Sequence, residues 1–457
     1  MQSCTFASLI RRSVLLSLAV APIVSAQQFT LQHTNSINLG TQFFGPDIPN
    51  GLPGSGYGSN PISVAYDGTN VYVGGQNNSG VSDFSGIVRV NNVFATTPAT
   101  FTPLTGTQLP ASSFTGINGL TADASGVYSI TEGSGVGTLI RKSDSSGNLI
   151  WSKNANDIVS GYLPSAIAID PKVNNGNPGV ALIGIGSGRR TALTTDAGTV
   201  LFGPSGFAGP QGGIINSEPS STIGSTYRGM SFDSAGNILA LGNRGIGYGT
   251  RDTTVAGPNQ YNLFRSLTNQ ADRTTAILTK EEKTFAAQGV QFLEGTGPNA
   301  LMAFNARPGA DITTAMNVTD LSGNVTSVNT RGVQIRTLTG AVASGIQSVL
   351  LGDEDGIGGA FSGVGKGLAI GKDADNNPVL FVVSLEERKL DVYSLEPTWT
   401  TTSGDWSTPA NWLAGLVPNS GLQNARFGAG IASTGGTVTL NDNRTTKNLK
   451  LDSAGSF

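Results

Sequence analysis

Apolar residues along this chain alternate with polar ones in short runs, and the runs come in pairs separated by turn residues. An apolar alternating run, a turn containing Asp or Gly, and a second apolar run recur at residues 63–75, 119–131, 166–186, 229–243, 289–305 and 367–384. Alternation with a period of two indicates half-buried β-strands, and Asp-Gly turns are typical of β-hairpins. The pattern therefore predicts six hairpins, and no segment shows a convincing helical period.

Weaker second hairpins follow some of the six, most clearly at residues 138–152 and 191–202. Two consecutive hairpins make a four-stranded unit, and such a unit recurs about every 60 residues, which exceeds the usual propeller repeat. This predicts an all-β fold, a six-bladed β-propeller over residues 27–396, with seven blades as the alternative count. Residues 29–40 are expected to close the ring by pairing with residues 389–395. A tandem of β-sandwiches is the competing architecture.

The pattern changes after residue 396, where three of the four tryptophans gather. Trp399, Trp406 and Trp412 are interspersed with Gly, Asn and Pro, and the runs NARF, GGTVTL and NLKL follow them. This stretch resembles the opening module of the autotransporter-associated β-strand repeat proteins. The resemblance implies that residues 397–457 are the capped start of a parallel β-solenoid. Asn424 departs from that family, in which an acidic residue is common at this position, so a turn-capping or ion-binding role there is in question.

The first coil of a solenoid exposes its apolar interior, so it needs a terminal cap. Three indoles can cover such an end because each buries on the order of 200 Å². We therefore expect Trp399, Trp406 and Trp412 to form a structural cap, with sugar stacking as the alternative. A stable stack needs at least three repeats, and the sequence has room for about two rungs. The chain is accordingly expected to be a fragment of a longer protein.

The first 26 residues have the pattern of a secretory signal peptide. Arg11 and Arg12 precede an apolar run, and the small-residue pattern VSA predicts cleavage before Gln27. A twin-arginine signal is a weaker alternative. The protein is therefore expected at the outer cell surface or outside the cell. Cys4 is the only cysteine, so the mature chain would be held together without disulfides.

The charge balance narrows the classes of partner. The formal net charge is -3, with no block of Lys or Arg that could neutralise a row of phosphates, so nucleic-acid binding is not expected. Beyond the signal peptide, no run is long and apolar enough to predict a membrane helix.

The chain offers few residues for catalysis. His33 is the only histidine, which excludes histidine-based zinc and iron sites, and no G-x-S-x-G motif is present. No catalytic residue or cofactor is therefore assigned. Asp373, Asp375 and Asn377 are spaced as in a calcium loop, but Pro378 replaces the required Gly. The alternative for these three residues is an ordinary hairpin turn.

Four hairpins begin with a polar residue, then Gly, then an apolar residue, and the polar residues are Asn118, Arg228, Gln288 and Lys366. Equivalent positions in a propeller repeat lie on one ring, so these side chains are expected to surround one mouth of the central channel. Arg and Lys there would favour an anionic group such as an acidic glycan or surface polymer. The alternative is that they are solvated residues preceding a close-packing glycine.

These observations favour an exported structural or recognition protein, with the propeller as a head on a β-solenoid stalk, acting in adhesion or glycan binding. The alternative is an extracellular propeller hydrolase or lyase that acts on a polysaccharide or a lactone. Two carboxylates converging in the channel at a separation of about 5 to 10 Å would indicate the enzyme.

Overall fold

The computed structural model covers the whole chain and describes residues 31–39, 44, 57, 60–76, 85–94, 98–109, 114–133, 138–184, 190–203, 227–242, 245–249, 251, 264–266, 290–294, 301–306, 316–319, 325–328, 332–337, 349–350, 367–373, 377–384, 388–413, 416–427 and 436–451. The expected signal peptide lies outside these ranges. None of the helices within them has the length and apolar character needed to cross a membrane.

Apart from one two-stranded hairpin, the described strands between Leu31 and Leu395 fall into antiparallel groups of four, and each group corresponds to one blade; two of the groups are joined into one eight-stranded sheet. Blade 1 contains β2 (Asn60–Tyr66), β3 (Val71–Gln76), β4 (Ser85–Asn91) and β5 (Thr100–Leu109). Blade 2 contains β6 (Phe114–Asp123), β7 (Gly126–Gly133), β8 (Leu139–Ser143) and β9 (Leu149–Asn154), and the short helix α1 (Ala155–Ile158) follows. A bridge between β3 and β6 joins these two blades.

Blade 3 contains β10 (Pro164–Asn174), β11 (Asn177–Gly184), β12 (Arg190–Thr194) and β13 (Val200–Phe202). Blade 4 contains β14 (Tyr227–Phe232), β15 (Ile238–Gly242), β16 (Gly245–Gly249) and β17 (Phe264–Ser266). Blade 5 contains β18 (Val290–Glu294), β19 (Leu301–Ala306), β22 (Gly332–Thr337) and β23 (Val349–Leu350), with the hairpin of β20 (Met316–Thr319) and β21 (Val325–Val328) inserted before β22. Blade 6 contains β24 (Leu368–Lys372), β25 (Pro378–Ser384), β26 (Lys389–Leu395) and β1 (Leu31–Asn38).

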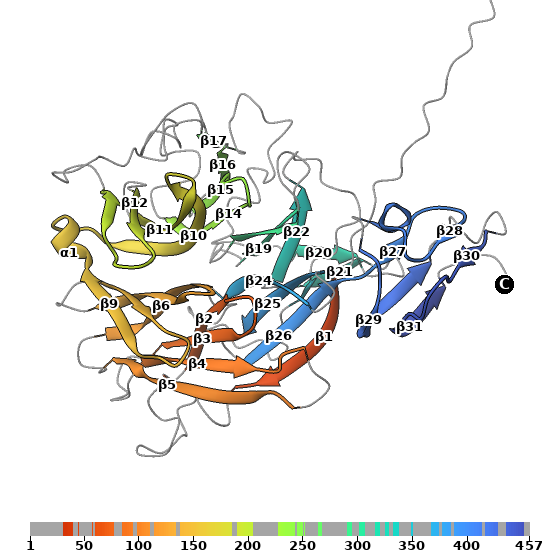
Figure 1. Ribbon diagram of the computed structural model, residues 1–457, viewed down its shortest axis with the longest axis horizontal. Coiled ribbons are helices and arrows are strands. Elements are labelled where there is room, and N and C mark those ends of the chain that lie inside the picture. Colours follow the sequence, from red (N-terminus) through yellow and green to blue (C-terminus); the bar gives the residue numbers. More distant parts are fainter. Residues whose placement is uncertain are drawn as a thin grey trace, which may run out of the picture.

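The first strand of each blade contacts the first strand of the next, in the closed order β2, β6, β10, β14, β18, β24 and back to β2. Figure 1 shows the sheets arranged around this ring. Sheets that radiate from a closed ring of inner strands define a β-propeller, and the described residues account for six blades. The expected propeller is confirmed, and tandem β-sandwiches are excluded for these strands.

The ring closes through a strand from the other end of the chain. β1 pairs antiparallel with β26, from Leu31 opposite Leu395 to Asn38 opposite Lys389. Blade 6 therefore takes three strands from one end of the propeller sequence and its outermost strand from the other. The predicted closure is confirmed, and it gives β26 a partner on each side, which leaves no open edge there.

Blades 1, 2 and 3 are apolar on both faces because each is packed between two neighbours. In β11, Val180 and Leu182 face the core shared with blade 2, whereas Ala181 and Ile183 face the core shared with blade 4. Strands buried on both faces have nearly continuous apolar runs. This packing explains why the inner hairpins are richer in Val, Ile and Leu than a half-buried strand requires.

The hairpin turns depend on Asp side chains that bind the backbone. Oδ1 of Asp67 accepts hydrogen bonds from the backbone N–H groups of Thr69 and Asn70, both at 2.7 Å. Gly68 has a φ of 102°, a region that suits glycine. Burial tends to raise the pKa of Asp67, but hydrogen bonds from Asn70, Tyr72 and Thr69 outweigh it and hold the pKa below its ordinary value. Turn chemistry visible in the sequence therefore sets the strand boundaries.

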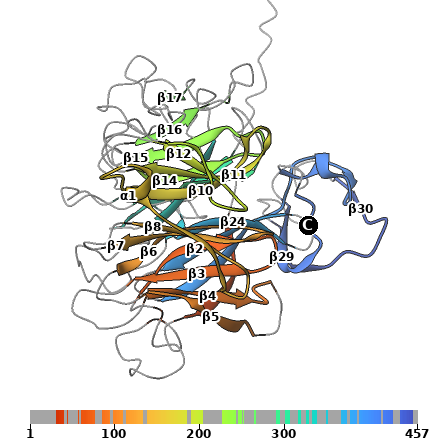
Figure 2. The same cartoon turned by 60° about the vertical axis from the view of Figure 1, so that its left-hand side comes forward.

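The chain changes from antiparallel to parallel pairing immediately after the propeller. In the C-terminal module (residues 397–457), β27 (Thr398–Trp399), β29 (Ser420–Phe427) and β31 (Thr446–Leu451) form a parallel sheet. β28 (Gly404–Asp405) and β30 (Val438–Thr439) form a second parallel pair. Figure 2 shows this module as an open coil beside the propeller. Its strand β29 contacts β1, so the module lies against the strand that closes the ring.

The three tryptophans form the core of the C-terminal module. Their exposed fractions are 4% for Trp399, 4% for Trp406 and 2% for Trp412. Trp412 packs edge-on against both other indoles, with ring centroids 5.1 and 4.9 Å apart, and Phe427 joins the cluster. Trp406 donates from Nε1 to the carbonyl of Pro418 at 2.9 Å. Indoles buried to this extent offer no open face on which a sugar could stack.

A buried carboxylate lies where the propeller meets the module. Glu396 has no exposed side-chain surface, and its Oε1 accepts hydrogen bonds from Lys450 Nζ at 2.5 Å and from Asn424 Nδ2 at 3.1 Å. Arg426 Nη1 lies 3.5 Å from the other carboxylate oxygen. Asn448 Nδ2 in turn donates to Asn424 Oδ1 at 3.1 Å. Asn424, at the position where an acidic residue is common in the resembling family, thus links Glu396 to the next strand.

Replacing Ile37 with Ala should weaken the closure of the ring. Ile37 in β1 is 6% exposed and belongs to the core between blades 6 and 1, and truncating such a side chain costs about 2 to 4 kcal/mol. The free energy of unfolding, measured by urea denaturation, should fall by that amount. Ser36→Ala, on the exposed face of the same strand, should change it by less than about 0.5 kcal/mol. Equal effects of the two substitutions would contradict the closure.

Replacing Glu396 with Ala should destabilise the module, because Lys450 and Arg426 would lose their shared counter-charge. We expect a loss of about 2 kcal/mol, less than for a fully buried pair because Lys450 is partly exposed. Tryptophan fluorescence during urea denaturation reports on this region, since three of the four tryptophans lie there. Asp442→Ala removes an exposed ion pair with Arg444 and should cost less than about 1 kcal/mol. A Glu396→Ala variant as stable as Asp442→Ala would refute this role.

Candidate functional site

A β-bulge recurs at the same place in four of the innermost strands. In β2, β6, β10 and β14, the pairing with the second strand of the blade skips one residue near the start of the strand. The extra residues are Ile62, Asn118, Ser165 and Arg228. Bulges redirect a side chain and are frequent next to functional sites. The inner ring therefore carries one extra residue per blade at equivalent positions in blades 1 to 4.

Two of the four residues predicted to surround the channel mouth occupy this bulge position. Asn118 is the extra residue of β6 and is half-buried, and Arg228 is the extra residue of β14. The structure thus places these two residues at equivalent points of blades 2 and 4, as their shared sequence context predicts. Gln288 and Lys366 lie outside the described residues.

Two of the glycines that follow these polar residues, Gly119 and Gly367, have a packing role. A Cβ on Gly119 would lie 3.1 Å from Ile167 Cγ2 in blade 3, and a Cβ on Gly367 would lie 2.7 Å from Val383 Cβ within blade 6. The second distance is shorter than side-chain atoms tolerate. Close packing therefore explains Gly119 and Gly367, as the alternative interpretation proposed, while the bulge in β6 separately sets the position of Asn118.

Polar side chains on the inner strands join neighbouring blades. Ser63 Oγ donates to the carbonyl of Ile117 at 2.7 Å, which links blade 1 to blade 2. Ser231 Oγ lies 3.1 Å from Gln291 Oε1, and Gln291 Nε2 donates to the carbonyl of Leu368 at 3.0 Å, which connects blades 4, 5 and 6. Sequence reasoning missed these residues, although a polar residue within an apolar inner strand is a usable signal. They fix the spacing of the inner strands.

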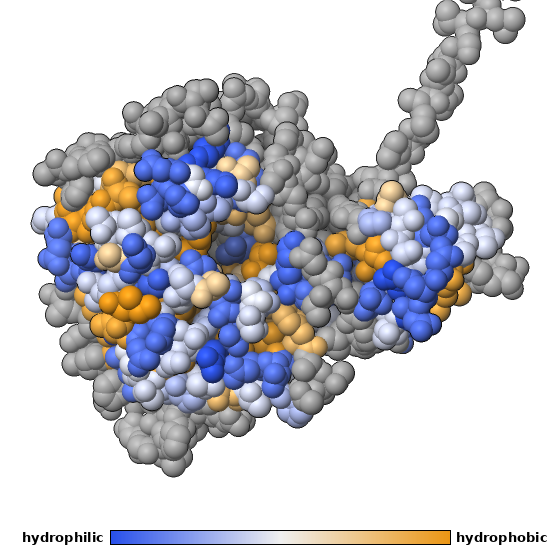
Figure 3. Space-filling model, in the orientation of Figure 1, coloured by the Kyte–Doolittle hydropathy of each residue, from blue (hydrophilic) through white to orange (hydrophobic). Residues whose placement is uncertain are grey.

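The described surface is hollowed at the centre of the ring. Figure 3 looks onto this face and shows a depression where the inner strands converge, with hydrophilic residues beside apolar ones around it. Channels of this kind are common binding sites because several blades contribute side chains to one small space. The ring of inner strands therefore offers a concave site formed by several blades.

The proposed calcium loop has a turn geometry that recurs elsewhere in the chain. Asp373 Oδ1 accepts a hydrogen bond from the backbone N–H of Asn377 at 2.9 Å, and the Asn377 amide contacts both carboxylate oxygens at 3.3 Å. Asp144 binds Asn148, and Asp233 binds Asn237, in the same way. Asp375 lies outside the described residues. The geometry matches the alternative of a hairpin turn, and calcium binding here stays a prediction.

A second polar cluster, which sequence reasoning missed, lies between blades 2 and 3. Lys142 is 4% exposed, and its Nζ donates to the carbonyl of Thr195 at 2.7 Å and to Ser125 Oγ at 3.0 Å. Burial lowers the pKa of Lys142, and the carboxylates of Asp123 and Asp196 oppose that shift. The ammonium group also lies 5.2 Å from the centre of the Tyr128 ring. Lys142 is thus a buried cation whose bonds cross from one blade to the next.

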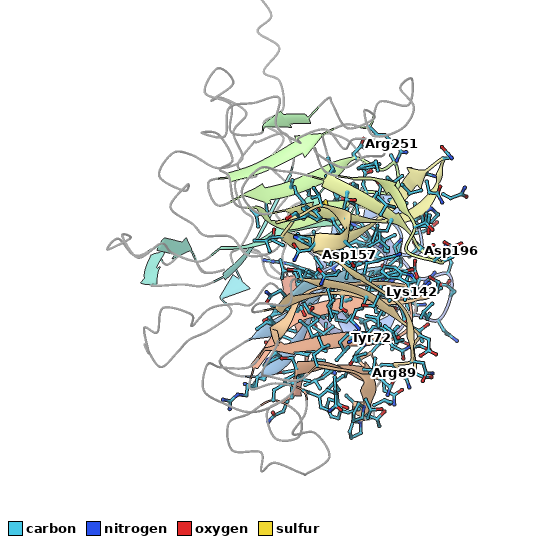
Figure 4. The ribbon with its side chains drawn as sticks, turned by 90° about the vertical axis from the view of Figure 1, so that its left-hand side faces the viewer. Tyr72, Arg89, Lys142, Asp157, Asp196 and Arg251 are labelled. Atoms are coloured by element: carbon cyan, nitrogen blue, oxygen red, sulfur yellow. The ribbon has the colours of Figure 1, made fainter. Side chains whose placement is uncertain are left out.

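Cations at other blade boundaries make the same kind of contact. Arg89 donates to the carbonyl of Ser145 at 2.8 Å across the boundary between blades 1 and 2. Arg251 donates to the carbonyl of Lys172 and pairs with Asp170 at 3.3 Å across the boundary between blades 3 and 4. In Figure 4, Arg89, Lys142, Asp196 and Arg251 follow one another along one side of the molecule. These contacts hold blades together. They engage Arg89, Lys142 and Arg251, the cations that an anion-binding site on this side of the molecule would need.

Within the described ranges, no three His, Cys, Asp or Glu residues gather as a metal site would require. His33 lies in β1, opposite Tyr393 of β26 in the outermost pair of blade 6. The polar side chains that the structure describes on the inner strands include Ser63, Asn118, Ser231 and Gln291. Such groups bind a ligand by hydrogen bonding.

No protein-family model and no curated protein sequence matches the chain. Among solved structures, it is similar to a streptogramin B lyase (14% identity, TM-score 0.38, covering 81% of this chain and 99% of the other). It is also similar to a PQQ-bound aldose sugar dehydrogenase from Streptomyces coelicolor (11%, 0.39, 81% and 99%) and to virginiamycin B lyase from Staphylococcus aureus (12%, 0.39, 80% and 100%). These likenesses are too weak to transfer an activity.

Proposed function

We propose that this chain is an exported, non-catalytic recognition protein of the outer cell surface or extracellular space. The propeller is the recognition head, and the C-terminal module is the capped start of a parallel β-solenoid stalk. The ligand of the head is an anionic glycan or surface polymer, bound at the central depression. Export rests on the signal-peptide pattern of residues 1–26.

The equivalence of Asn118 and Arg228 carries the ligand proposal. Both are the extra residue of a bulge near the start of an innermost strand, so their backbones occupy corresponding points on one ring. A guanidinium group recognises carboxylates through paired, charge-assisted hydrogen bonds, and an amide elsewhere on the same ring can bind hydroxyls. Gln288 and Lys366, which share the sequence context, would add a further amide and cation. A ring of this composition suits a sugar that carries a carboxylate or sulfate.

The packing of the C-terminal module supports its assignment as a capped coil. Trp399 in β27 is followed by Phe427 and then Leu451 at matching positions of the parallel sheet, so apolar residues stack from one strand to the next. Trp406 and Trp412 pack beside Trp399, at the end of the stack where the first strand β27 lies. Indoles in that position shield the start of a stack from water. We assign the three tryptophans as the cap on this basis.

Binding of an acidic polysaccharide tests the head. Polygalacturonate should bind the full chain, as measured by isothermal titration calorimetry, and the uncharged polymer dextran should not. Arg228→Ala should weaken polygalacturonate binding at least tenfold, about 1.4 kcal/mol. The affinity of the unmodified chain should fall as salt is raised, because the contact is electrostatic.

Arg444→Ala is the matched control, because it removes one cation in the C-terminal module, where Arg444 pairs with Asp442. It should bind polygalacturonate as the unmodified chain does. Equal losses in the two variants would indicate a general effect of net charge, and unchanged binding by Arg228→Ala would sink the proposed site.

A further inference from the structure

A lysine, an asparagine and a buried carboxylate meet where the propeller joins the C-terminal module. Glu396 Oε1 accepts hydrogen bonds from Lys450 Nζ at 2.5 Å and from Asn424 Nδ2 at 3.1 Å. Glu396 has no exposed side-chain surface, and Asn424 is 5% exposed. One carboxylate oxygen therefore holds an amine and a carboxamide side by side, in a place that is largely closed to water.

Strand pairing sets this arrangement. In the parallel pairing of β29 with β31, Asn424 lies opposite Asn448, and Arg426 lies opposite Lys450. Alternate residues of paired strands share one face of the sheet, so these four side chains point the same way. Lys450 is two residues beyond the partner of Asn424, and a long side chain spans such a diagonal. The fold thus brings the lysine amine to the asparagine amide.

We propose that Lys450 and Asn424 join through an intramolecular isopeptide bond, with Glu396 as the acid–base catalyst. Lys450 Nζ attacks Cγ of Asn424, so the Nζ–Cγ bond forms and the Cγ–Nδ2 bond breaks. Glu396 takes two protons in turn from Nζ and passes each to Nδ2, which leaves as ammonium. The carboxylate is regenerated, the charge of the lysine departs with the ammonium ion, and no oxidant or cofactor is needed. This inference goes beyond the proposed recognition function and does not depend on it.

The neighbours of the reacting groups favour this step. Asn448 Nδ2 donates to Asn424 Oδ1 at 3.1 Å, and this is the oxygen on which negative charge develops during the attack, where a positioned donor stabilises the transition state. Arg426 Nη1 lies 3.5 Å from the second oxygen of Glu396, so the buried carboxylate keeps a counter-charge after Lys450 has lost its own. The Lys450 side chain is 41% exposed, which gives the ammonium ion a route to solvent.

Asn424 is a better acceptor of the amine than Glu396 is. A carboxylate repels a nucleophile, and Glu396 is the counter-charge of two cations. The carbonyl group of Asn424 is neutral, and its oxygen is hydrogen-bonded to Asn448. The bond therefore forms at Asn424 with loss of ammonia, rather than at Glu396 with loss of water.

The bond would tie β29 to β31 covalently. Cys4 is the only cysteine of the chain and lies in the expected signal peptide, so a disulfide cannot do this in the mature protein. A crosslink between neighbouring strands restricts the unfolded chain as a disulfide does. An amide bond has the further property that reducing agents do not break it.

Mass spectrometry of a tryptic digest of the full chain tests the bond. We expect a branched peptide in which residues 390–426 are joined to residues 448–457, lighter by one ammonia than the two separate peptides. The digest decides where an intact mass would not, because cyclisation of an N-terminal glutamine at Gln27 also releases ammonia. A digest that holds only unbranched peptides overturns the proposal. So does a branched peptide lighter by one water, which would place the bond at Glu396.

Three variants test the roles of the residues in the same digest. Glu396→Gln keeps the size of the side chain but removes the base, and Lys450→Arg keeps the cation but removes the amine, so both should lose the branched peptide. Lys447→Arg is the matched control, because it replaces another lysine of β31 and should retain it. Tryptophan fluorescence checks that the variants are folded, and the digest of the unmodified chain decides the bond even where one is not. A branched peptide at undiminished yield in Glu396→Gln refutes the catalytic role.

Discussion

The architecture depends on the pairing of β1 with β26. A propeller has no covalent closure, and here the first described strand and the last strand of the ring form neighbouring strands of one blade. The described seams, from blade 6 through blade 1 to blade 4, bury apolar residues from both sides, so a ring opened at one of them would expose two such faces at once. Closure of the ring therefore keeps the apolar faces on both sides of each of these seams buried. The C-terminal module follows β26 without a long linker and contacts β1, so its position depends on the same pairing.

Within the closed ring, side chains of one blade donate hydrogen bonds to the backbone of the next. The chain has one cysteine, inside the expected signal peptide. On the inner strands, Ser63 and Gln291 donate to carbonyls of the next blade, and nearer the outside Lys142 does the same. A backbone carbonyl is a strong acceptor wherever it is buried, so these contacts need no matching side chain. The bulges place Asn118 and Arg228 at corresponding points of the inner ring, and that is why both are candidates for binding a ligand.

The C-terminal module is built differently from the propeller. Its strands stack in parallel, and its core consists of a few large side chains. Trp399, Phe427 and Leu451 succeed one another along the stack, and burial is complete for the first two and partial for the third. On the other face of the sheet, Glu396 ties three strands to the end of the propeller through Lys450, Arg426 and Asn424. The same stacking that buries the indoles leaves Leu449 and Leu451 of the last described strand exposed.

The amino-acid sequence by itself determined the hairpins, the closing strand and the break at residue 396, because alternation, Asp turns and tryptophan spacing are local properties of the chain. It also brought Asn118 and Arg228 together as one class of position. Only the tertiary structure decided that these are bulge residues, that Glu396 and Asn424 join propeller and module, and that Lys142 spans two blades. Those contacts join residues tens of positions apart. A local pattern indicates that a side chain is polar and buried, but its partner depends on how two distant strands are placed against each other.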